Sequence, residues 1–205
     1  MQEFAALRSK TPDHALVVPT FDYTKSDQSG SRWILVTDEK GNPAAFGAFK
    51  RLRITDLASL ISTGKIWYDD PPFARMNIRC DADFVSGDCF YRGGMYVYPG
   101  HRKSGLPWGI ATYAQAIAAL EGVDWIVGQA FEEIVERGIP VHTYGFETVE
   151  LQSEYVGHCP LKGPLNGGKS ALYLLTCSRA FFLNNIRMAR NILVPGSDKE
   201  LVSAA

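Results

Sequence analysis

Residues 97–106 read VYPGHRKSGL, and they separate a β-rich run at residues 90–98 from a helical run at residues 108–120. A turn that leads into a helix exposes unpaired backbone N–H groups, and the helix dipole adds positive potential there. An Arg-Lys pair within the turn adds formal charge, and Gly105 lets the backbone approach a bulky group without a Cβ clash. The stretch is therefore predicted to be an anion-binding turn between a strand and a helix.

The segments around this turn predict a mixed sheet. Two β-rich runs joined by the turn residues DEKGN form the clearest hairpin, and a short helix ending at Gly64 follows them. After the central helix come a short apolar strand, a short helix and two further strands. The expected elements, in order, are strands at 14–19, 33–37 and 44–54, a helix at 55–62, the strand at 90–98 with a bulge at Gly93–Gly94, the helix at 108–120, a strand at 125–129, a helix at 130–137, and strands at 141–152 and 170–178. This order predicts an α/β (α+β) fold with a mixed, mostly antiparallel central sheet flanked by helices.

The length of 205 residues fits one domain. We expect an N-terminal segment with a short strand at 1–31, a single domain at 32–183 with an insertion at about 55–89, and a C-terminal tail at 184–205. Residues 1–14 are expected to be loosely held.

The composition excludes several classes of protein. Hydrophobic residues make up 46% and the formal net charge is −1, which argues against a nucleic acid or an anionic membrane as the main partner. There is no apolar stretch of membrane-spanning length and no apolar run of signal-peptide type at the start, so a cytoplasmic location is expected. The four cysteines form no CxxC pair and, with the histidines, match no zinc spacing, so no metal site is expected.

The turn resembles the central motif of the GCN5-related N-acetyltransferases. In that family a strand ends in Val-x-Pro and is followed by Arg/Gln-x-x-Gly-x-Gly/Ala and a helix. Val97 and Pro99 match the strand end, Arg102 the first loop position and Gly105 the central glycine. The last small residue of the motif is replaced by Pro107, which has no N–H to offer a phosphate.

The resemblance implies an acyl-CoA-dependent N-acyltransferase with acetyl-CoA as co-substrate and a primary amine as acceptor. The strands at 90–98 and 125–129 would splay apart and admit the pantetheine arm. The residues implied in acetyl-CoA binding are Val97, Arg102, Lys103, Ser104, Gly105, Leu106 and Gln129. The aromatic-rich segment 55–92 would shape the acceptor pocket, and a homodimer is a further expected partner because members of the family often dimerise.

The catalytic residues do not follow from the resemblance directly. Many members carry a proton-donating Tyr shortly before a Gly-Phe pair. If Gly145-Phe146 is that pair, the position falls near Val141, and if Gly138-Ile139 is its counterpart, it falls near residues 134–135. Neither alignment supplies a Tyr, and we prefer the second because Pro140 and the alternation over 141–152 favour a strand.

The candidates for acid and base come from the neighbouring residues. Tyr144 is the candidate proton donor, and Asp88, Glu133 and His142 are candidate bases. On a strand, Tyr144 and His142 would lie on opposite faces. Each base also has a structural interpretation: Asp88 as a turn residue, Glu133 on a solvated helix face and His142 as an ordinary exposed histidine.

Two other functions stay open. The missing Tyr and Pro107 favour a non-catalytic acyl-CoA or small-ligand binding protein on the same fold. Residues 163–170 satisfy the P-loop pattern G-x-x-x-x-G-K-[ST], which would indicate a nucleotide-binding protein. A P-loop follows a buried strand and precedes a helix, and this context does not fit, so the stretch is predicted to be a turn between the last two strands.

Overall fold

The computed structural model describes residues 1–11, 19–22, 24–72, 80, 82–159, 161 and 163–193, with the backbone alone at 157–158, 163–167 and 191–193. The strands are β1 (Ser31–Thr37), β2 (Pro43–Ile54), β3 (Gly87–Val97), β4 (Trp125–Phe131), β5 (Thr148–Cys159) and β6 (Gly163–Ser178). The helices are α1 (Gln2–Ser9), α2 (Leu57–Ser62), α3 (Leu106–Leu120), α4 (Glu132–Val135), α5 (Ile139–His142) and α6 (Arg179–Leu193), with short 3-10 turns η1 (Pro19–Phe21) and η2 (Pro99–His101).

The strands form one sheet in the order β1-β2-β3-β4-β6-β5. Every neighbouring pair is antiparallel except β3 and β4, which are parallel. The predicted fold class, a mixed and mostly antiparallel sheet flanked by helices, is confirmed. The predicted hairpin is confirmed as well, and the carboxylate of Asp38 closes its turn by accepting the N–H groups of Lys40 and Asn42.

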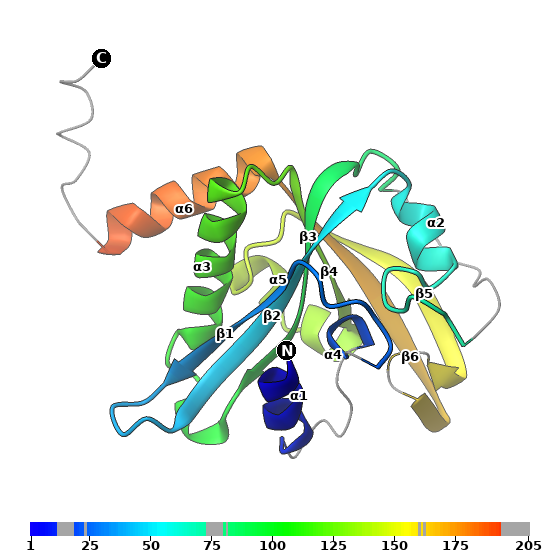
Figure 1. Cartoon of the computed structure of the whole chain (residues 1–205), viewed down its shortest axis with the longest axis horizontal. Helices are drawn as coiled ribbons and strands as arrows, with labels where there is room; N and C mark the ends of the chain where they lie inside the picture. The colour runs from blue at the N-terminus through cyan, green and yellow to red at the C-terminus, as the bar shows by residue number, and fades with distance from the viewer. Residues whose placement is uncertain are drawn as a thin grey trace.

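The strands β3 and β4 separate after a short parallel contact. Their register covers four pairs and ends at Arg92 and Gly128, although both strands continue beyond those residues. The predicted bulge lies at this point, because the β2–β3 register shifts between Phe46 and Ala48 and Gly94 has a φ of 63°. A bulge bends its strand, so β3 turns away from β4 here. In Figure 1 the two halves of the sheet diverge from this vertex.

Helices cover both faces of the sheet. On one face α1, α2 and residues 66–68 pack on β2, β3 and β6 through a core that includes Phe4, Leu57 and Trp67. On the other face α3 and α6 pack through a core that includes Ala114, Ala118 and Phe182. Figure 1 shows α6 crossing α3 on this second face.

Both ends of the chain differ from expectation. Residues 2–9 form a helix, α1, whose Phe4 is fully buried against Phe21, Trp33 and Phe46 at ring-centroid distances of 5.5–6.1 Å. Residues 179–193 form α6, which crosses the boundary expected at residue 184. The strand expected at 14–19 lies outside the described residues except for Pro19, which belongs to η1.

Residues 141–147 do not form the predicted strand. Residues 139–142 form α5 with Pro140 in its first turn, where a proline needs no N–H partner, and β5 begins only at Thr148. The preferred alignment of the Gly-Phe pair was therefore based on a wrong element. In the structure Gly145 and Phe146 lie between α5 and β5.

Residues 163–170 are strand rather than turn. They begin β6 and pair with β5, with Lys169 opposite Val156 and Ser170 opposite Tyr155. A P-loop is a turn that leads into a helix, so the pattern here carries no phosphate cradle. Among the described residues, no helix is both long and apolar enough to cross a membrane.

Candidate functional site

The anion-binding turn has the backbone that its sequence predicts. After β3 the chain makes the 3-10 turn η2, and then Lys103 and Gly105 adopt left-handed conformations with φ of 68° and 77°. Gly105 is the N-cap of α3, and a Cβ added to it would meet no atom within 4 Å. The turn therefore opens outward at the start of a 15-residue helix.

Several amides of this turn are free to bind an anion. Among the described residues, no backbone or side-chain acceptor takes the N–H groups of Lys103, Ser104 or Gly105, and Leu106 is the first residue of α3. The first turn of α3 holds no acidic residue that would compete with a ligand. Pro107 has no N–H, so the amides that an anion could reach are the four that precede it. Arg102 donates from Nε to the carbonyl oxygen of Val97 at 3.5 Å, which ties the turn to the end of β3.

A cavity of about 160 Å³ lies along α3 from Trp108 onward. Its lining comes from three elements: Trp108, Ala111, Thr112 and Gln115 of α3, residues 141–145, and Asn185, Met188 and Ala189 of α6. The cavity thus brings Tyr144 and His142 to the same helix that carries the anion-binding turn. They share its wall because they lie on a helical turn and not on a strand.

Arg92 lies behind Tyr144. Its Nη2 donates to the Tyr144 carbonyl oxygen at 2.7 Å, and its guanidinium lies 4.3 Å from the centroid of the Phe146 ring. Burial lowers the pKa of Arg92 to about 10, so it remains a cation at neutral pH. Burial raises the pKa of the Tyr144 phenol, an effect that the Arg92 cation partly offsets, so Tyr144 keeps its proton at neutral pH.

Gln129 lies on the opposite face of the sheet, one residue past the last β3–β4 pair. Its Oε1 accepts the Trp67 indole N–H at 2.8 Å and the Tyr91 hydroxyl at 2.7 Å. Its Nε2 donates to Gln152 Oε1 at 2.9 Å. Trp67 is fully buried here, while the neighbouring residues 68–70 and 72 line a second, more open hollow of about 670 Å³ with residues 24–28.

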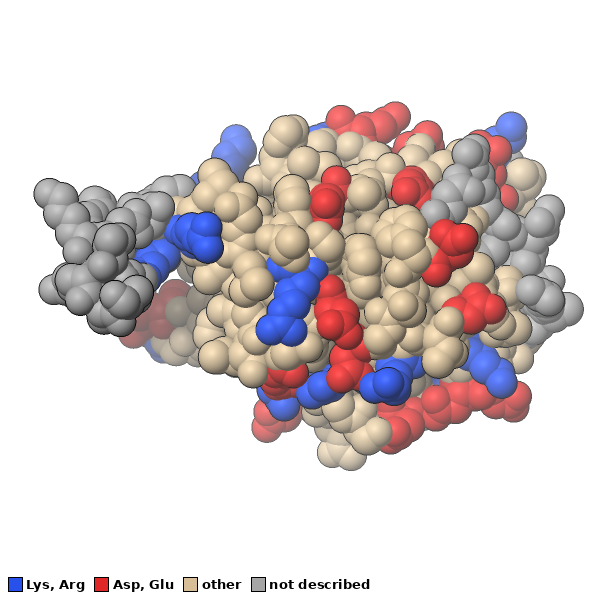
Figure 2. Space-filling view, turned by 90° about the horizontal axis from the view of Figure 1, so that it is seen from above, with Lys and Arg blue, Asp and Glu red and all other residues tan. Residues whose placement is uncertain are grey.

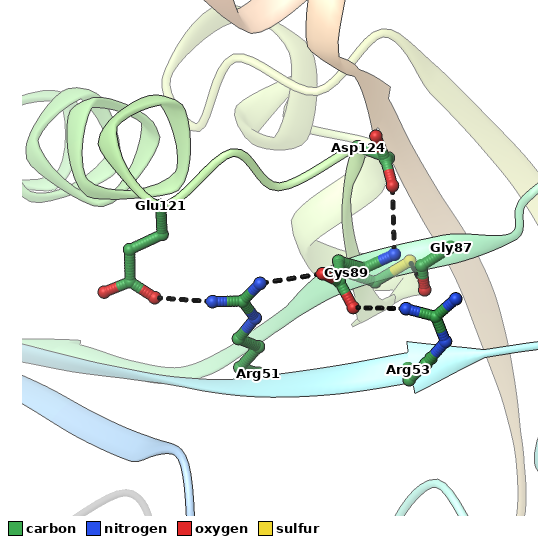
Figure 3. A network of polar contacts seen from close by, with 7 residues as sticks. Arg51, Arg53, Gly87, Cys89, Glu121 and Asp124 are labelled. Carbon is green, nitrogen blue, oxygen red and sulfur yellow. Dashed lines mark hydrogen bonds and ion pairs between the residues drawn. The ribbon is translucent and has the colours of Figure 1, made fainter.

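Asp88 lies far from these groups. Its carboxylate binds Arg51 at 2.7 Å and Arg53 at 3.6 Å, and Arg51 also reaches Glu121 at the end of α3 (Figure 3). Asp88 is the second residue of the 11-residue strand β3, and the rest of the strand separates it from the anion-binding turn, a span of roughly 30 Å at the usual rise per strand residue. The structure gives Asp88 an ion network at the opposite end of the strand.

Glu133, by contrast, is the second residue of α4, which follows β4 directly at the diverging end of the sheet, and it is exposed. The charges elsewhere are mixed. On the face seen in Figure 2, the acidic and basic side chains of the described residues are interspersed.

Comparison with known proteins gives likenesses of fold. No protein-family model and no curated protein matches the sequence. The solved structures that match include the spermidine/spermine N-acetyltransferase SpeG from Vibrio cholerae, at 13% identity and a TM-score of 0.44, covering 76% of this chain and 71% of that one. Nourseothricin acetyltransferase matches at 14% identity and a TM-score of 0.45, covering 74% of this chain and 67% of that one. A putative phosphinothricin N-acetyltransferase matches at 16% identity and a TM-score of 0.42, covering 73% of this chain and 75% of that one.

The fold resembles that of GCN5-related N-acetyltransferases. At these identities and TM-scores the matches concern the fold alone and carry nothing about reaction or substrate.

Sequence reasoning missed Arg92, Gln152 and the whole of α6. Arg92 left one signal, because it is a lone charge inside the aromatic-rich strand FYRGGMYVY. The sequence gives no comparable signal for Gln152, because an isolated glutamine in a strand is usually solvated.

Proposed function

We propose that this protein is an acyl-CoA-dependent N-acyltransferase that moves an acetyl group from acetyl-CoA to a primary amine. The observation that carries the proposal is the vertex at Arg92 and Gly128, where two parallel strands separate just before the anion-binding turn. Beyond the vertex, the backbone of β3 has no β4 partner and is available to a ligand. An extended chain ending in a pyrophosphate fits this arrangement, with its phosphates on the amides of residues 103–106.

The reaction needs little covalent chemistry from the protein. The acceptor nitrogen attacks the thioester carbonyl carbon, the C–N bond forms, the C–S bond breaks, the nitrogen loses a proton and the thiolate gains one. Backbone N–H groups at the diverging end of β3 would stabilise the oxyanion. Tyr144 is our candidate for returning a proton to the thiolate, since its phenol stays protonated at neutral pH. His142 and Glu133 are the candidate bases, and the position of Asp88 argues against a direct role for it.

A thermal-shift titration with acetyl-CoA, CoA and Mg-ATP tests binding. A ligand that binds only the native state raises the melting temperature with its occupancy. We expect acetyl-CoA and CoA to stabilise the protein and Mg-ATP to have no effect. Stabilisation by Mg-ATP alone, or by none of the three, would contradict the proposal.

Turnover is tested by the release of CoA thiol. Tyr144→Phe should lower kcat by about 10²-fold, a typical loss for a general acid, with the acetyl-CoA titration unchanged. Thr112→Val, which removes a hydroxyl from another residue that lines the same cavity, is the matched control and should leave kcat unchanged. His142→Ala tests the candidate base separately. An unchanged kcat for Tyr144→Phe would remove Tyr144 from the mechanism.

A non-catalytic acyl-CoA binding protein is the second candidate. Val141 lies four residues before Gly145, at the position where the first alignment expects a proton-donating Tyr. Val141 lines the cavity but has no hydroxyl to donate a proton, and this favours the second candidate. Stabilisation by acetyl-CoA without thiol release across an amine panel would support this second function.

A further inference from the structure

The hydrogen bonds around Gln129 fix the orientation of two amides. An indole N–H can only donate, so the atom of Gln129 that receives Trp67 Nε1 at 2.8 Å has to be its oxygen. The Tyr91 hydroxyl donates to the same oxygen at 2.7 Å. The nitrogen of Gln129 therefore faces Gln152, and the atom of Gln152 that receives it at 2.9 Å is in turn an oxygen.

This chain of bonds leaves a buried donor without an acceptor. Gln152 is only 1% exposed, and its Nε2 has no hydrogen-bond partner among the described residues. The orientation of this amide follows from the donor-only indole, so a flipped side chain does not remove the mismatch. A buried unpaired donor is costly, which favours a bound group that supplies an oxygen here.

An unpaired acceptor lies on the same face. Glu150 stands in one row with Gln129, since both pair with Leu174 of β6, and strands two apart are separated by roughly 10 Å. Its Oε2 is buried and, within the described part of the chain, has no partner. The β5 register shift between Leu151 and Ser153 makes Gln152 the extra residue, and its bond to Gln129 places it on this face.

We propose that Glu150 and Gln152 form the acceptor subsite, and that the acceptor is an amine that also carries an oxygen acceptor, as in an amino alcohol. The ammonium donates to Glu150 Oε2, and the hydroxyl oxygen accepts from Gln152 Nε2. The proposal rests on the acyltransferase function. Gln129 joins the subsite to the vertex, so the acceptor approaches from the α1 face while acetyl-CoA lies along α3 on the other face.

Three amines with the same number of heavy atoms test this pairing: 2-aminoethanol, n-propylamine and 1,2-diaminoethane. They differ only in whether an oxygen acceptor, a methyl or a second ammonium meets Gln152. We expect kcat/KM for 2-aminoethanol to exceed that for n-propylamine by about tenfold, because only the hydroxyl satisfies the buried donor. Calorimetric titration of the same amines into the protein without CoA measures the subsite separately from turnover.

Two substitutions sharpen the test. Gln152→Met removes the donor and should bring the preference for 2-aminoethanol over n-propylamine to about one. Gln152→Glu keeps an oxygen for Gln129 but replaces the donor with an acceptor, so it should shift the preference to 1,2-diaminoethane. Gln28→Met, at the separate hollow beside residues 68–72, is the control and should leave all ratios unchanged.

The outcomes separate the two proposals. If acetyl-CoA does not raise the melting temperature of the wild-type protein, the acyltransferase function is refuted. A calorimetric difference in affinity among the three amines would then still support the subsite. If acetyl-CoA binds but the three amines bind equally well, or if neither Gln152 variant changes their ratio, the subsite is refuted and the buried donor holds a structural water.

Discussion

Gly94→Ala tests the packing of α1 on the bulge that diverts β3. Gly94 has a φ of 63°, and a Cβ on it would lie 2.7 Å from Cζ of Phe4. An L-residue in this conformation costs roughly 1–2 kcal/mol. The Phe4 ring is fully buried among three other rings and has little room to move, so overpacking should add about 1–3 kcal/mol. The expected loss in the free energy of unfolding is therefore about 2–5 kcal/mol.

Urea denaturation followed by circular dichroism measures this loss, and Gly41→Ala is the matched control. Gly41 has a φ of 81°, but a Cβ added to it would meet no atom within 4 Å, so its alanine variant carries only the conformational cost. Phe4→Leu in the Gly94→Ala background should recover part of the difference between the two variants. If Gly94→Ala is no more destabilising than Gly41→Ala, then α1 does not pack on the bulge and the reasoning is refuted.

Three further predictions concern the site. Gly128→Ala should cost about 1–3 kcal/mol of stability in a urea melt, because its Cβ would lie 2.9 Å from the Arg92 carbonyl oxygen, and a midpoint equal to wild type would argue against the vertex. Lys103→Gly should stabilise the fold by about 1 kcal/mol, because Lys103 has a left-handed φ of 68°. The same change should weaken acetyl-CoA binding in the thermal-shift titration, and unchanged binding would show that the Lys103 charge does not contribute to phosphate binding. Asp88→Asn should leave kcat/KM within about twofold of wild type but lower the melting temperature at pH 7. The hydrogen bond from Arg51 holds the pKa of Asp88 in the folded protein below its usual value. The stabilisation is therefore present at a pH above the pKa that Asp88 has in the unfolded chain, and it is lost as the pH falls through the pKa that Asp88 has in the folded protein. A difference in melting temperature that persists in strong acid would contradict this account.

The hairpin and the central strand-turn-helix were predictable because their signals are local. The turn at residues 38–42 carries its own carboxylate, and Gly105 supplies the left-handed residue that starts α3. Each of these features depends on neighbours within a few positions along the chain. The order of the elements then restricts the sheet to few topologies.

The errors came from segments whose structure depends on distant partners. Residues 141–147 alternate like a strand, but Gly145 is held by Gln115 of α3 and Asn185 of α6, which bond its carbonyl oxygen at 3.1 Å each. Polar α1 was expected to be loose, yet Phe4 gives it an anchor that exists only once β1, β2 and η1 are assembled.

The sequence by itself determined the turn that starts α3 and the mixed sheet, since glycine conformation and hydrophobic period are properties of short stretches. Only the tertiary structure decided which side chains share a site. It placed Asp88 in an ion network far from the turn, set Arg92 behind Tyr144, and oriented Gln152 through Trp67 and Gln129. Such pairings join residues dozens of positions apart, and burial selects them only when the strands and helices that carry them have come together.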